Sequence, residues 1–276
     1  MRVFVTGATG YIGSAVVQEL IHAGHQVVGL TRSDRGAALL KEAGAEAHFG
    51  SLDDPDSLIS GAAAADGVIH LAFNHDFSDF AGSLRTDLRV IEAIGTVLKG
   101  TGKSFIVTDH ANGEASENAA IALAEQGVRT SIVSLAPTVH GEGDKGFIPG
   151  LINTARTKGV SAYIGDGTNR WPAVHRLDAA SLFRLALEAA PAGSKLDGTA
   201  DEGVPLRDIA AVIGRHLNVP VVSIPREEAN AHFGFLGMIA SLDIPRSSMQ
   251  TQALLGWRPV HTALIPDLEQ GHYFIK

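Results

Sequence analysis

The chain has 276 residues, 45% of them hydrophobic and 19% charged, which suffices for one large domain or two joined ones with a buried core. Its net charge of −8 argues against nucleic acid or an anionic membrane as a partner, because both bind basic surfaces. The absence of cysteine excludes disulfides and a cysteine nucleophile. No apolar run reaches membrane-spanning length and the first residues do not resemble a signal peptide, so we expect a cytoplasmic protein.

The first half of the chain alternates short β-rich runs with helical patterns. The expected strands are 2–6, 26–30, 45–49, 67–71, 105–108 and 129–134. The expected helices are 11–23, 35–43, 55–62, 80–99 and 116–126. Nearly continuous apolar strands separated by helices predict a parallel sheet covered on both faces. Right-handed crossovers make this a doubly wound sheet of the Rossmann type.

After Gly141 the alternation of strands and helices becomes less regular. We expect a helix over 147–158, a strand, turn and strand across 160–175, and a helix over 179–190 capped by Asp178. A further helix over 204–217 and a strand over 219–225 follow. The sequence thus predicts an α/β protein with a Rossmann domain over 1–141 and a smaller C-terminal α/β substrate lobe over 142–276. We expect residues 171–190 to return to the first domain.

The stretch VFVTGATGYIGSAVV carries the strongest motif, three glycines between the first strand and the first helix. Such glycines allow a sharp turn, a close approach of backbone N–H groups to a pyrophosphate, and tight packing of helix on strand. The phosphates then lie at the positive end of the helix. This loop predicts a dinucleotide site formed by Gly7, Thr9, Gly10, Tyr11, Ile12 and Gly13.

The end of the second strand carries no acidic residue of the kind that binds the ribose hydroxyl of NAD. Thr31, Arg32 and Ser33 stand there instead, and an arginine suits the 2′-phosphate of NADP. We therefore expect NADP (NADPH) rather than NAD, although Asp34 nearby weakens the case. The other residues assigned to the cofactor are Leu52, Asp53, Leu71, Ala72, Phe73 and Pro137.

The motifs TGATGYIG, GSLDDPDSL, VIHLAFN and LAPTVHGEGD resemble the extended short-chain dehydrogenase/reductases, the group of sugar-nucleotide epimerases, dehydratases and related reductases. In the last motif Ala136 replaces the family's arginine and His140 its tyrosine. The resemblance covers most of the chain and weakens after Ala190. It implies a Rossmann domain, a nicotinamide cofactor and a C-terminal substrate lobe.

The catalytic pattern departs from that family, which uses a tyrosine followed four residues later by a lysine. None of the three tyrosines of this chain has that lysine. The chain is similar to an atypical branch with a His-x-x-x-Arg in this place, but here the nearest match is His110 followed by Glu114. Thr108, His110 and His140 are the candidate catalytic residues, because histidine donates protons near neutral pH. A plain loop position explains His110 equally well.

Four residues are assigned to the substrate: Asn74, His75, Trp171 and His175. A polar loop end explains the first two equally well, and core packing is the alternative for Trp171. The histidine spacing of the chain and the absence of His-Glu-x-x-His argue against a metal site.

The helix-start signals after Thr108 place the next helix only about six residues further on. The resembled family usually has a longer active-site loop in this connection. One hypothesis is therefore that the protein has a loop between Thr108 and His110 which this sequence lacks. An intact mass well above 28.8 kDa would reveal it.

Two functions fit these observations. The first is an NADPH-dependent oxidoreductase that reduces a small ketone or aldehyde, working as a monomer or homodimer on a small-molecule carbonyl substrate. The second is a non-catalytic NADP(H)-binding redox sensor of the NmrA type, which the missing tyrosine motivates. A sugar-nucleotide epimerase or dehydratase ranks lower, because its chemistry depends on that tyrosine.

Overall fold

A computed structural model describes residues 1–74 and 79–275 of the chain. The chain divides into two compact units. Unit 1 comprises Met1–Ser134, Ala179–Leu196 and Gln250–Trp257. Unit 2 comprises Leu135–Asp178, Asp197–Met249 and Arg258–Lys276.

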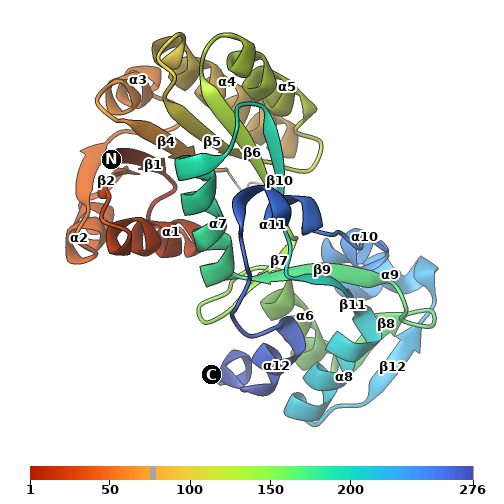
Figure 1. Ribbon diagram of the computed structural model, residues 1–276. Coiled ribbons are helices and arrows are strands. Elements are labelled where there is room, and N and C mark those ends of the chain that lie inside the picture. The colour runs from red at the N-terminus through yellow and green to blue at the C-terminus, as the bar shows by residue number, and fades with distance from the viewer. Residues whose placement is uncertain (75–78, 276) are drawn as a thin grey trace. The chain divides into compact units, whose positions relative to one another are not determined.

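Unit 1 is built on a seven-stranded sheet with the order β10-β6-β5-β4-β1-β2-β3 (Figure 1). Its strands are β1(Arg2–Thr6), β2(Gln26–Thr31), β3(Glu46–Phe49), β4(Gly67–His70), β5(Ser104–Thr108), β6(Arg129–Leu135) and β10(Ser194–Gly198). The pairs from β3 through β6 are all parallel. The predicted doubly wound parallel sheet of the Rossmann type is confirmed.

Helices cover both faces of this sheet (Figure 1). They are α1(Tyr11–His22), α2(Asp34–Glu42), α3(Pro55–Ala63), α4(Phe80–Leu98), α5(Glu114–Glu125) and α7(Arg176–Ala189). On one face, α3, α4 and α5 pack against the strands around Phe4, Phe105 and Ile91, all fully buried. Because both faces are covered, the strands are apolar along their whole length, which is the pattern that identified them.

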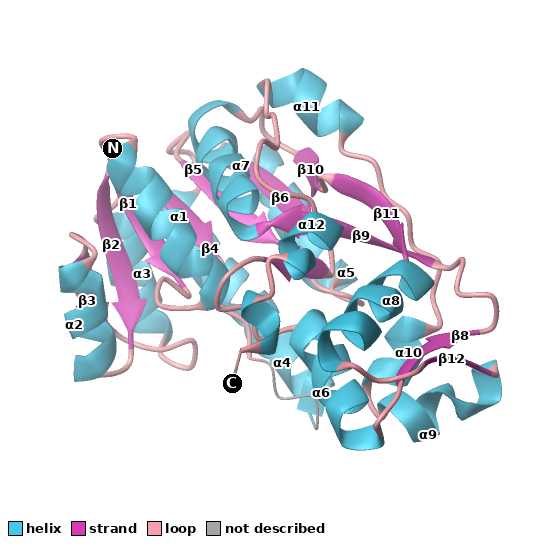
Figure 2. Cartoon of the chain, turned by 90° about the horizontal axis from the view of Figure 1, so that it is seen from below, coloured by secondary structure: helices cyan, strands magenta, loops and turns pink. Residues whose placement is uncertain are grey.

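Unit 2 holds two small sheets and several short helices (Figure 2). Its strands are β7(Thr138–His140), β8(Ser161–Ile164), β9(Arg170–His175), β11(Asp201–Pro205) and β12(Val221–Ile224). Its helices are α6(Phe147–Lys158), α8(Leu206–Leu217), η2(Arg226–Glu228), α9(Ala229–Phe233), α10(Leu236–Ala240), α12(Leu264–Glu269) and η3(His272–Phe274). The remaining helix, α11(Met249–Leu255), belongs almost entirely to unit 1.

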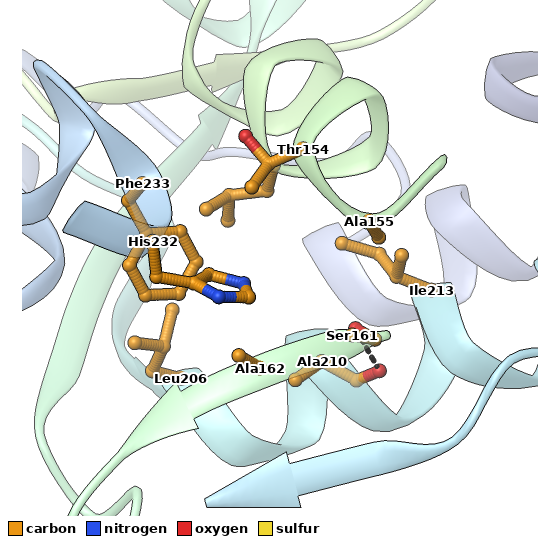
Figure 3. Close-up of a pocket in the computed structure, with 10 residues that line it drawn as sticks. Thr154, Ala155, Ser161, Ala162, Leu206, Ala210, Ile213, His232 and Phe233 are labelled. Atoms are coloured by element: carbon orange, nitrogen blue, oxygen red, sulfur yellow. Dashed lines mark hydrogen bonds between the residues drawn. The ribbon is translucent and has the colours of Figure 1, made fainter. Parts of the chain in front are cut away.

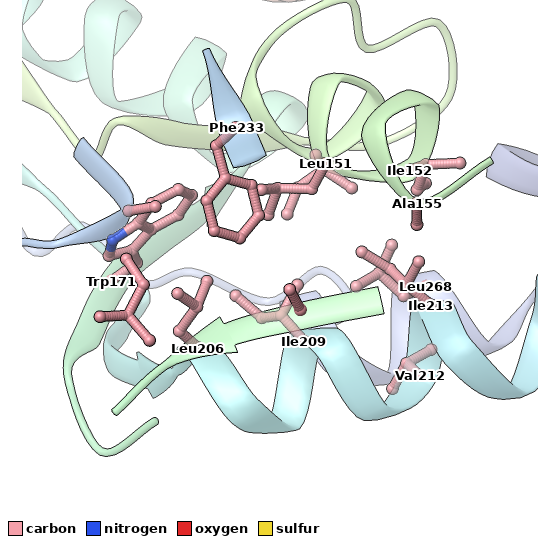
Figure 4. Packing of buried hydrophobic residues seen from close by; sticks show 14 of the residues in the cluster. Leu151, Ile152, Ala155, Trp171, Leu206, Ile209, Val212, Ile213, Phe233 and Leu268 are labelled. Carbon is pink, nitrogen blue, oxygen red and sulfur yellow. The ribbon is translucent and has the colours of Figure 1, made fainter. Parts of the chain in front are cut away.

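Unit 2 has its own hydrophobic core, which Figure 4 draws from close by. Trp171 and Ile209 are fully buried there, and Phe233 nearly so. The apolar face of α8 faces α6 across this core, with Ile213 near Ala155 (Figure 4). A separate core allows this unit to be stable on its own contacts.

One local expectation for unit 2 is confirmed and another was wrong. The predicted strand, turn and strand across 160–175 is present as β8, a turn at 165–167 and β9, and the two strands pair with different partners: β8 with β12, and β9 with β7 and β11. Asp178 does not cap a helix at 179, because α7 begins at Arg176. Its carboxylate instead accepts the backbone N–H groups of Val260 and His261, at 2.9 and 3.0 Å.

No helix in the two described ranges, 1–74 and 79–275, is both long enough and apolar enough to cross a membrane.

Candidate cofactor and catalytic site

The glycine loop after β1 brings three backbone segments into contact. Gly7 has a φ of 70°, which favours glycine, and its carbonyl accepts the N–H of Gly10 at 2.9 Å. A Cβ on Gly7 would lie 2.8 Å from the backbone nitrogen of Ala72, and one on Gly13 only 2.0 Å from the carbonyl oxygen of Gly7. Side chains therefore do not fit at Gly7 or Gly13, where the loop packs against the segment after β4 and against the start of α1.

No side chain caps the start of α1. Its N-cap is Gly10, and its first turn contains no acidic residue. In contrast, α2, α3 and α4 are capped by Ser33, Asp54 and Asp79, each accepting a backbone N–H. Because no side chain caps this helix start, its N–H groups and the positive end of the α1 dipole suit a phosphate. The residues of this loop thus fit the pyrophosphate of a dinucleotide.

Of the residues after β2 that we expected to bind the cofactor, Thr31 instead supports the backbone turn, whereas Arg32 and Ser33 are exposed. Thr31 is buried and its hydroxyl donates to the Ser33 carbonyl at 3.2 Å, so it supports the turn. The Ser33 hydroxyl oxygen accepts the N–H of Gly36 at 3.1 Å, but the side chain is exposed and its hydroxyl proton is still available. Arg32 is exposed. After β3, Leu52 is half-buried, and exposed Asp53 lies 3.9 Å from Arg89.

Residues 71–73, which follow β4, connect the glycine loop with His110. The N–H groups of Leu71 and Ala72 both donate to the Thr6 hydroxyl oxygen, at 3.3 and 3.2 Å. Phe73 follows, and its ring lies against that of His110 with centroids 3.9 Å apart and planes inclined by 30°. The predicted cofactor residue Phe73 and the predicted catalytic residue His110 are therefore in direct contact at the carboxyl ends of β4 and β5.

A buried polar group lies beneath this contact, and we call Thr6, His70, Asp87 and His110 the Asp87 cluster. Thr6 Oγ1 lies 2.6 Å from His70 Nδ1, and His70 Nε2 lies 3.1 Å from Asp87 Oδ1. Thr6, His70 and Asp87 are all at most 2% exposed. Since both lone pairs of the Thr6 oxygen accept backbone N–H groups, its proton is directed to His70 Nδ1. His70 is then the neutral tautomer whose Nε2–H donates to Asp87.

His110 reaches the same carboxylate from the other side. Its Nε2 lies 3.8 Å from Asp87 Oδ1, and its side chain is 17% exposed. Burial raises the pKa of Asp87, but the hydrogen bond and electrostatic attraction of His70, a hydrogen bond from Ser116 and, to a smaller extent, the attraction of His110 outweigh it, so that this pKa lies below its usual value. Thr108 Oγ1 donates to the His70 carbonyl at 3.0 Å. His110 thus lies beside the buried Asp87 carboxylate, and Thr108 is fixed to the backbone of His70, which binds the same carboxylate.

The third catalytic candidate, His140, belongs to a different group of histidines in unit 2. We call His140, His175 and His261, with Asp178 and Asp267, the His175 cluster. His140 Nδ1 lies 2.8 Å from Asp267 Oδ2, and His261 Nδ1 lies 2.8 Å from Asp178 Oδ1. His175 stacks on His261 with ring centroids 5.0 Å apart and meets His140 edge-on at 5.4 Å.

His175 has no carboxylate of its own among the residues that the structure describes. Its Nδ1 accepts the N–H of Leu177 at 3.3 Å. Burial, together with the positive charges that His140 and His261 would carry, lowers the pKa of His175 to about 4. This histidine is therefore neutral at physiological pH.

The remaining predicted residues are more scattered. Trp171 is fully buried and donates its indole N–H to the Ile239 carbonyl at 3.2 Å, which matches core packing. Pro137 is half-buried between β6 and β7 in unit 2, and Asn74 is exposed after β4 in unit 1. His75 lies outside the described residues.

Two hollows are present near these residues. In unit 1, an open groove of about 500 Å³ runs along α4 from Asn74 to Arg85 and Arg89. In unit 2, a cavity of about 10 Å³ has room for one water beside His232, whose ring points into it (Figure 3). The His232 Nε2 atom is buried without a partner in the described structure, and burial lowers the pKa of this side chain.

The connection between β5 and α5 consists of residues 109–113. It folds as a single tight turn in which the Gly113 N–H donates to the His110 carbonyl at 2.8 Å, with Asn112 at a φ of 60°. The Asp109 carboxylate accepts the Ser134 hydroxyl proton at 2.9 Å and so points away from His110. His110 is held in place by this turn.

Sequence reasoning did not identify Thr6, His70 or Asp87 as members of a site. A signal existed for Asp87, which lies among Leu84, Leu88 and Ile91 on the apolar stripe of α4. An acidic residue on the buried face of a helix requires a polar partner.

The sheet order and the uncapped glycine loop define a Rossmann-type dinucleotide-binding protein. Residues 3–96 match the model of the NAD dependent epimerase/dehydratase family. The chain belongs to this group, the extended short-chain dehydrogenase/reductases, whose members bind NAD or NADP, and the resemblance inferred from the motifs is confirmed.

The chain is 50% identical to an uncharacterised protein of Schizosaccharomyces pombe over 99% of this chain and 100% of that one. It is 43% identical to an uncharacterised protein of Saccharomyces cerevisiae, over 99% of both. More distantly, it is 26% identical to the 2-alkyl-3-oxoalkanoate reductase of Stenotrophomonas maltophilia, over 76% of this chain and 73% of that one. Among solved structures, a dTDP-glucose 4,6-dehydratase from Streptomyces venezuelae with NAD and TYD bound shares the fold, with 18% identity, a TM-score of 0.76 and coverage of 99% and 97%.

The match with each yeast protein extends over 295 residues, 19 more than the 276 of this chain. Both relatives therefore have residues without a counterpart here. This difference agrees in size with an active-site loop.

Proposed function

We propose that the protein is an NADPH-dependent reductase of a small carbonyl compound, using His110 as the proton donor. The observation that carries the proposal is the position of His110, which contacts Phe73 at the end of β4 and lies 3.8 Å from the buried Asp87 carboxylate. In Rossmann proteins the ligand occupies this edge of the sheet.

In this proposal each group of residues has a distinct role. The glycine loop and the start of α1 hold the pyrophosphate through backbone N–H groups. The bound cofactor supplies the hydride that reduces the carbonyl carbon. His110, in its protonated form, gives its proton to the carbonyl oxygen and is left neutral, to be reprotonated from solvent. Thr108 lies beside it, with its hydroxyl bonded to the His70 carbonyl.

The preference for NADPH rests on Arg32. This arginine is exposed after β2, next to the exposed Ser33 hydroxyl, where a 2′-phosphate would lie. In the variant R32A we expect the affinity for NADPH, measured by fluorescence titration, to fall about tenfold, since one charge-assisted contact is lost. NADH affinity should not change, and an equal loss for both cofactors would contradict the assignment.

The distant relative named as a 2-alkyl-3-oxoalkanoate reductase suggests which carbonyls to test first. NADPH oxidation should be followed at the nicotinamide absorption band with 3-oxoalkanoates, simple ketones and aldehydes. Turnover of at least one of these, lost in the variant H110Q while NADPH still binds, supports the proposal. Tight NADPH binding without turnover of any member would overturn it.

The second candidate is a non-catalytic NADP(H) sensor, favoured by the absence of the family's Tyr-x-x-x-Lys. It predicts different affinities for the oxidised and reduced cofactor together with a protein partner. Calorimetric titrations giving equal affinities would argue against it.

A further inference from the structure

We propose that Asp87 is the positioning residue of the reductase, which holds the His110 imidazole in place and favours its protonated form. The inference rests on the proposed function of His110 and adds the residue through which it acts. Asp87 is a buried carboxylate on α4, a helix that supplies none of the predicted catalytic residues.

The first step is the orientation of Asp87. The Thr6 hydroxyl accepts two backbone N–H groups and gives its proton to His70, so that His70 presents Nε2–H to Asp87 Oδ1 at 3.1 Å. Thr6 and His70 therefore fix one oxygen of the Asp87 carboxylate, and all three side chains are at most 2% exposed. A neutral His70 orients this carboxylate without neutralising it.

The second step is the charge that remains for His110. The hydrogen bond from His70 orients Asp87 and leaves its negative charge in place, and His110 Nε2 is 3.8 Å from the same oxygen. An opposite charge at this distance favours the protonated imidazole. Among the described residues, the other titratable groups around this centre are His70 from β4, whose ring nitrogens are both engaged, and Asp109, whose carboxylate is bonded to Ser134.

The third step is steric. The Phe73 ring, 3.9 Å away between centroids, covers one face of the imidazole, while Asp87 approaches its Nε2 edge. These two contacts leave the ring little freedom to rotate. A proton donor whose position is set before substrate arrives loses less entropy in the reaction.

The test compares the wild type with D87N, which keeps the shape of the side chain and removes its charge. Reduction of the best substrate of the carbonyl panel should fall about 10- to 100-fold in kcat/KM, a loss typical of impaired acid catalysis. The pH above which activity declines should move down by about one unit, since the imidazolium loses its partner. NADPH affinity should stay within about twofold, because the glycine loop is untouched.

Two further variants separate a positioning role from a structural one. In the H110Q background, D87N should cause no further loss of kcat/KM if Asp87 acts through His110. D109N removes a carboxylate next in sequence to His110 but bonded elsewhere, and it should leave the pH profile unchanged. An additive loss in the double variant, or an unchanged pH profile in D87N, would overturn the inference. If D87N does not fold, the pH profile of H110Q is the deciding measurement. A profile unchanged from the wild type would show that His110 is not the titrating group, and would overturn the inference.

A measurement without substrate keeps this inference distinct from the proposed function. The ring-proton NMR signal of His110, assigned from its loss in H110Q, should titrate at lower pH in D87N than in the wild type. If that shift is seen but no carbonyl is reduced, the reductase proposal fails and the pairing of Asp87 with His110 stands. If carbonyls are reduced and the signal titrates identically, the pairing fails and the reductase proposal stands.

Discussion

Unit 1 and unit 2 each contain a cluster of histidines and buried carboxylates, but the two clusters distribute charge differently. In the Asp87 cluster one carboxylate is shared by two histidines, at 3.1 and 3.8 Å. In the His175 cluster the carboxylates Asp267 and Asp178 each pair with one histidine at 2.8 Å, and His175 lies between the paired rings. The protonation state of a histidine therefore follows from how its neighbours are already paired.

The consequence for chemistry is direct. A histidine beside a carboxylate that is oriented but still charged is suited to hold a proton and deliver it. One surrounded by other histidines is suited to remain neutral, as the pKa of about 4 of His175 illustrates. We therefore place the proton donor in unit 1 and assign the His175 cluster a structural role.

The two tryptophans make this comparison measurable. Trp257 is buried in unit 1, where its indole donates to Ser181, and Trp171 is buried in unit 2. In the variants W257F and W171F the remaining tryptophan reports on one unit alone. Urea unfolding followed by fluorescence then gives a free energy of unfolding for each unit.

The largest effect is expected from D267A. His140 is fully buried, its Nδ1 is bonded to Asp267, and its Nε2 has no partner in the described ranges. Removing the carboxylate leaves the ring without any hydrogen bond, which costs about 3 kcal/mol of the free energy of unfolding. The Trp171 signal should register this loss.

The control for this prediction is D267N, which keeps an acceptor for His140 and should cost about 1 kcal/mol. Equal losses in D267A and D267N would mean that charge, and not the hydrogen bond, stabilises His140.

A somewhat smaller effect is expected from T6V in unit 1. The substitution preserves the volume of Thr6 but removes the partner of His70 Nδ1 and the acceptor for the Ala72 N–H. Two buried polar atoms are left unpaired, which costs about 2 kcal/mol on the Trp257 signal. T6S retains the hydroxyl and should cost about half as much, so an equally unstable T6S would contradict the role of the hydrogen bonds.

The smallest effect concerns pH. The folded-state pKa of His175 lies near 4, below the ordinary histidine value of 6.5, so the unfolded chain binds this proton first as pH falls. Stability of unit 2 is therefore lost between about pH 6.5 and pH 4, by about 1 kcal/mol once partial exposure of the ring is allowed for. The variant H175F keeps a ring to stack on His261 and should remove this pH dependence.

In unit 1, Asp87 gives a pH dependence of the same sign but in a lower pH range. Its pKa is lowered in the folded state, so its contribution is present above pH 3.8 and lost below it. Between pH 6.5 and pH 4, hydrogen exchange should therefore rise in residues 258–275 of unit 2 before it rises in β4. If hydrogen exchange rose at the same pH in both segments, the two clusters would not differ in the pH range over which they lose stability.

The sequence predicted unit 1 well because its signals are local. Apolar strands, helix caps and a glycine loop each depend on neighbouring residues, and the boundaries of the elements predicted before residue 136 agree within about two residues, whereas β10 and α11 were not predicted. The Asp87 cluster was missed because Thr6, His70 and Asp87 come from three elements up to 81 positions apart, and only the fold brings them together.

Unit 2 was harder to predict for the same reason. The partner of β8 is β12, about 60 residues later in the chain, and no nearby turn specifies that pairing. The real role of Asp178 likewise depends on residues 260 and 261, which no local pattern connects with it.

The five-residue turn between β5 and α5 has an evolutionary consequence. Its two ends are fixed independently, because β5 is paired on both sides and α5 is packed through Ala120 and Leu123. Lengthening such a surface connection costs only about 0.6 kcal/mol of loop entropy for each doubling of its length. A lineage can therefore insert or delete an entire active-site segment here in one genetic event and keep the same folded scaffold. The turn that carries the proposed proton donor is therefore also a place where the chain tolerates insertions and deletions.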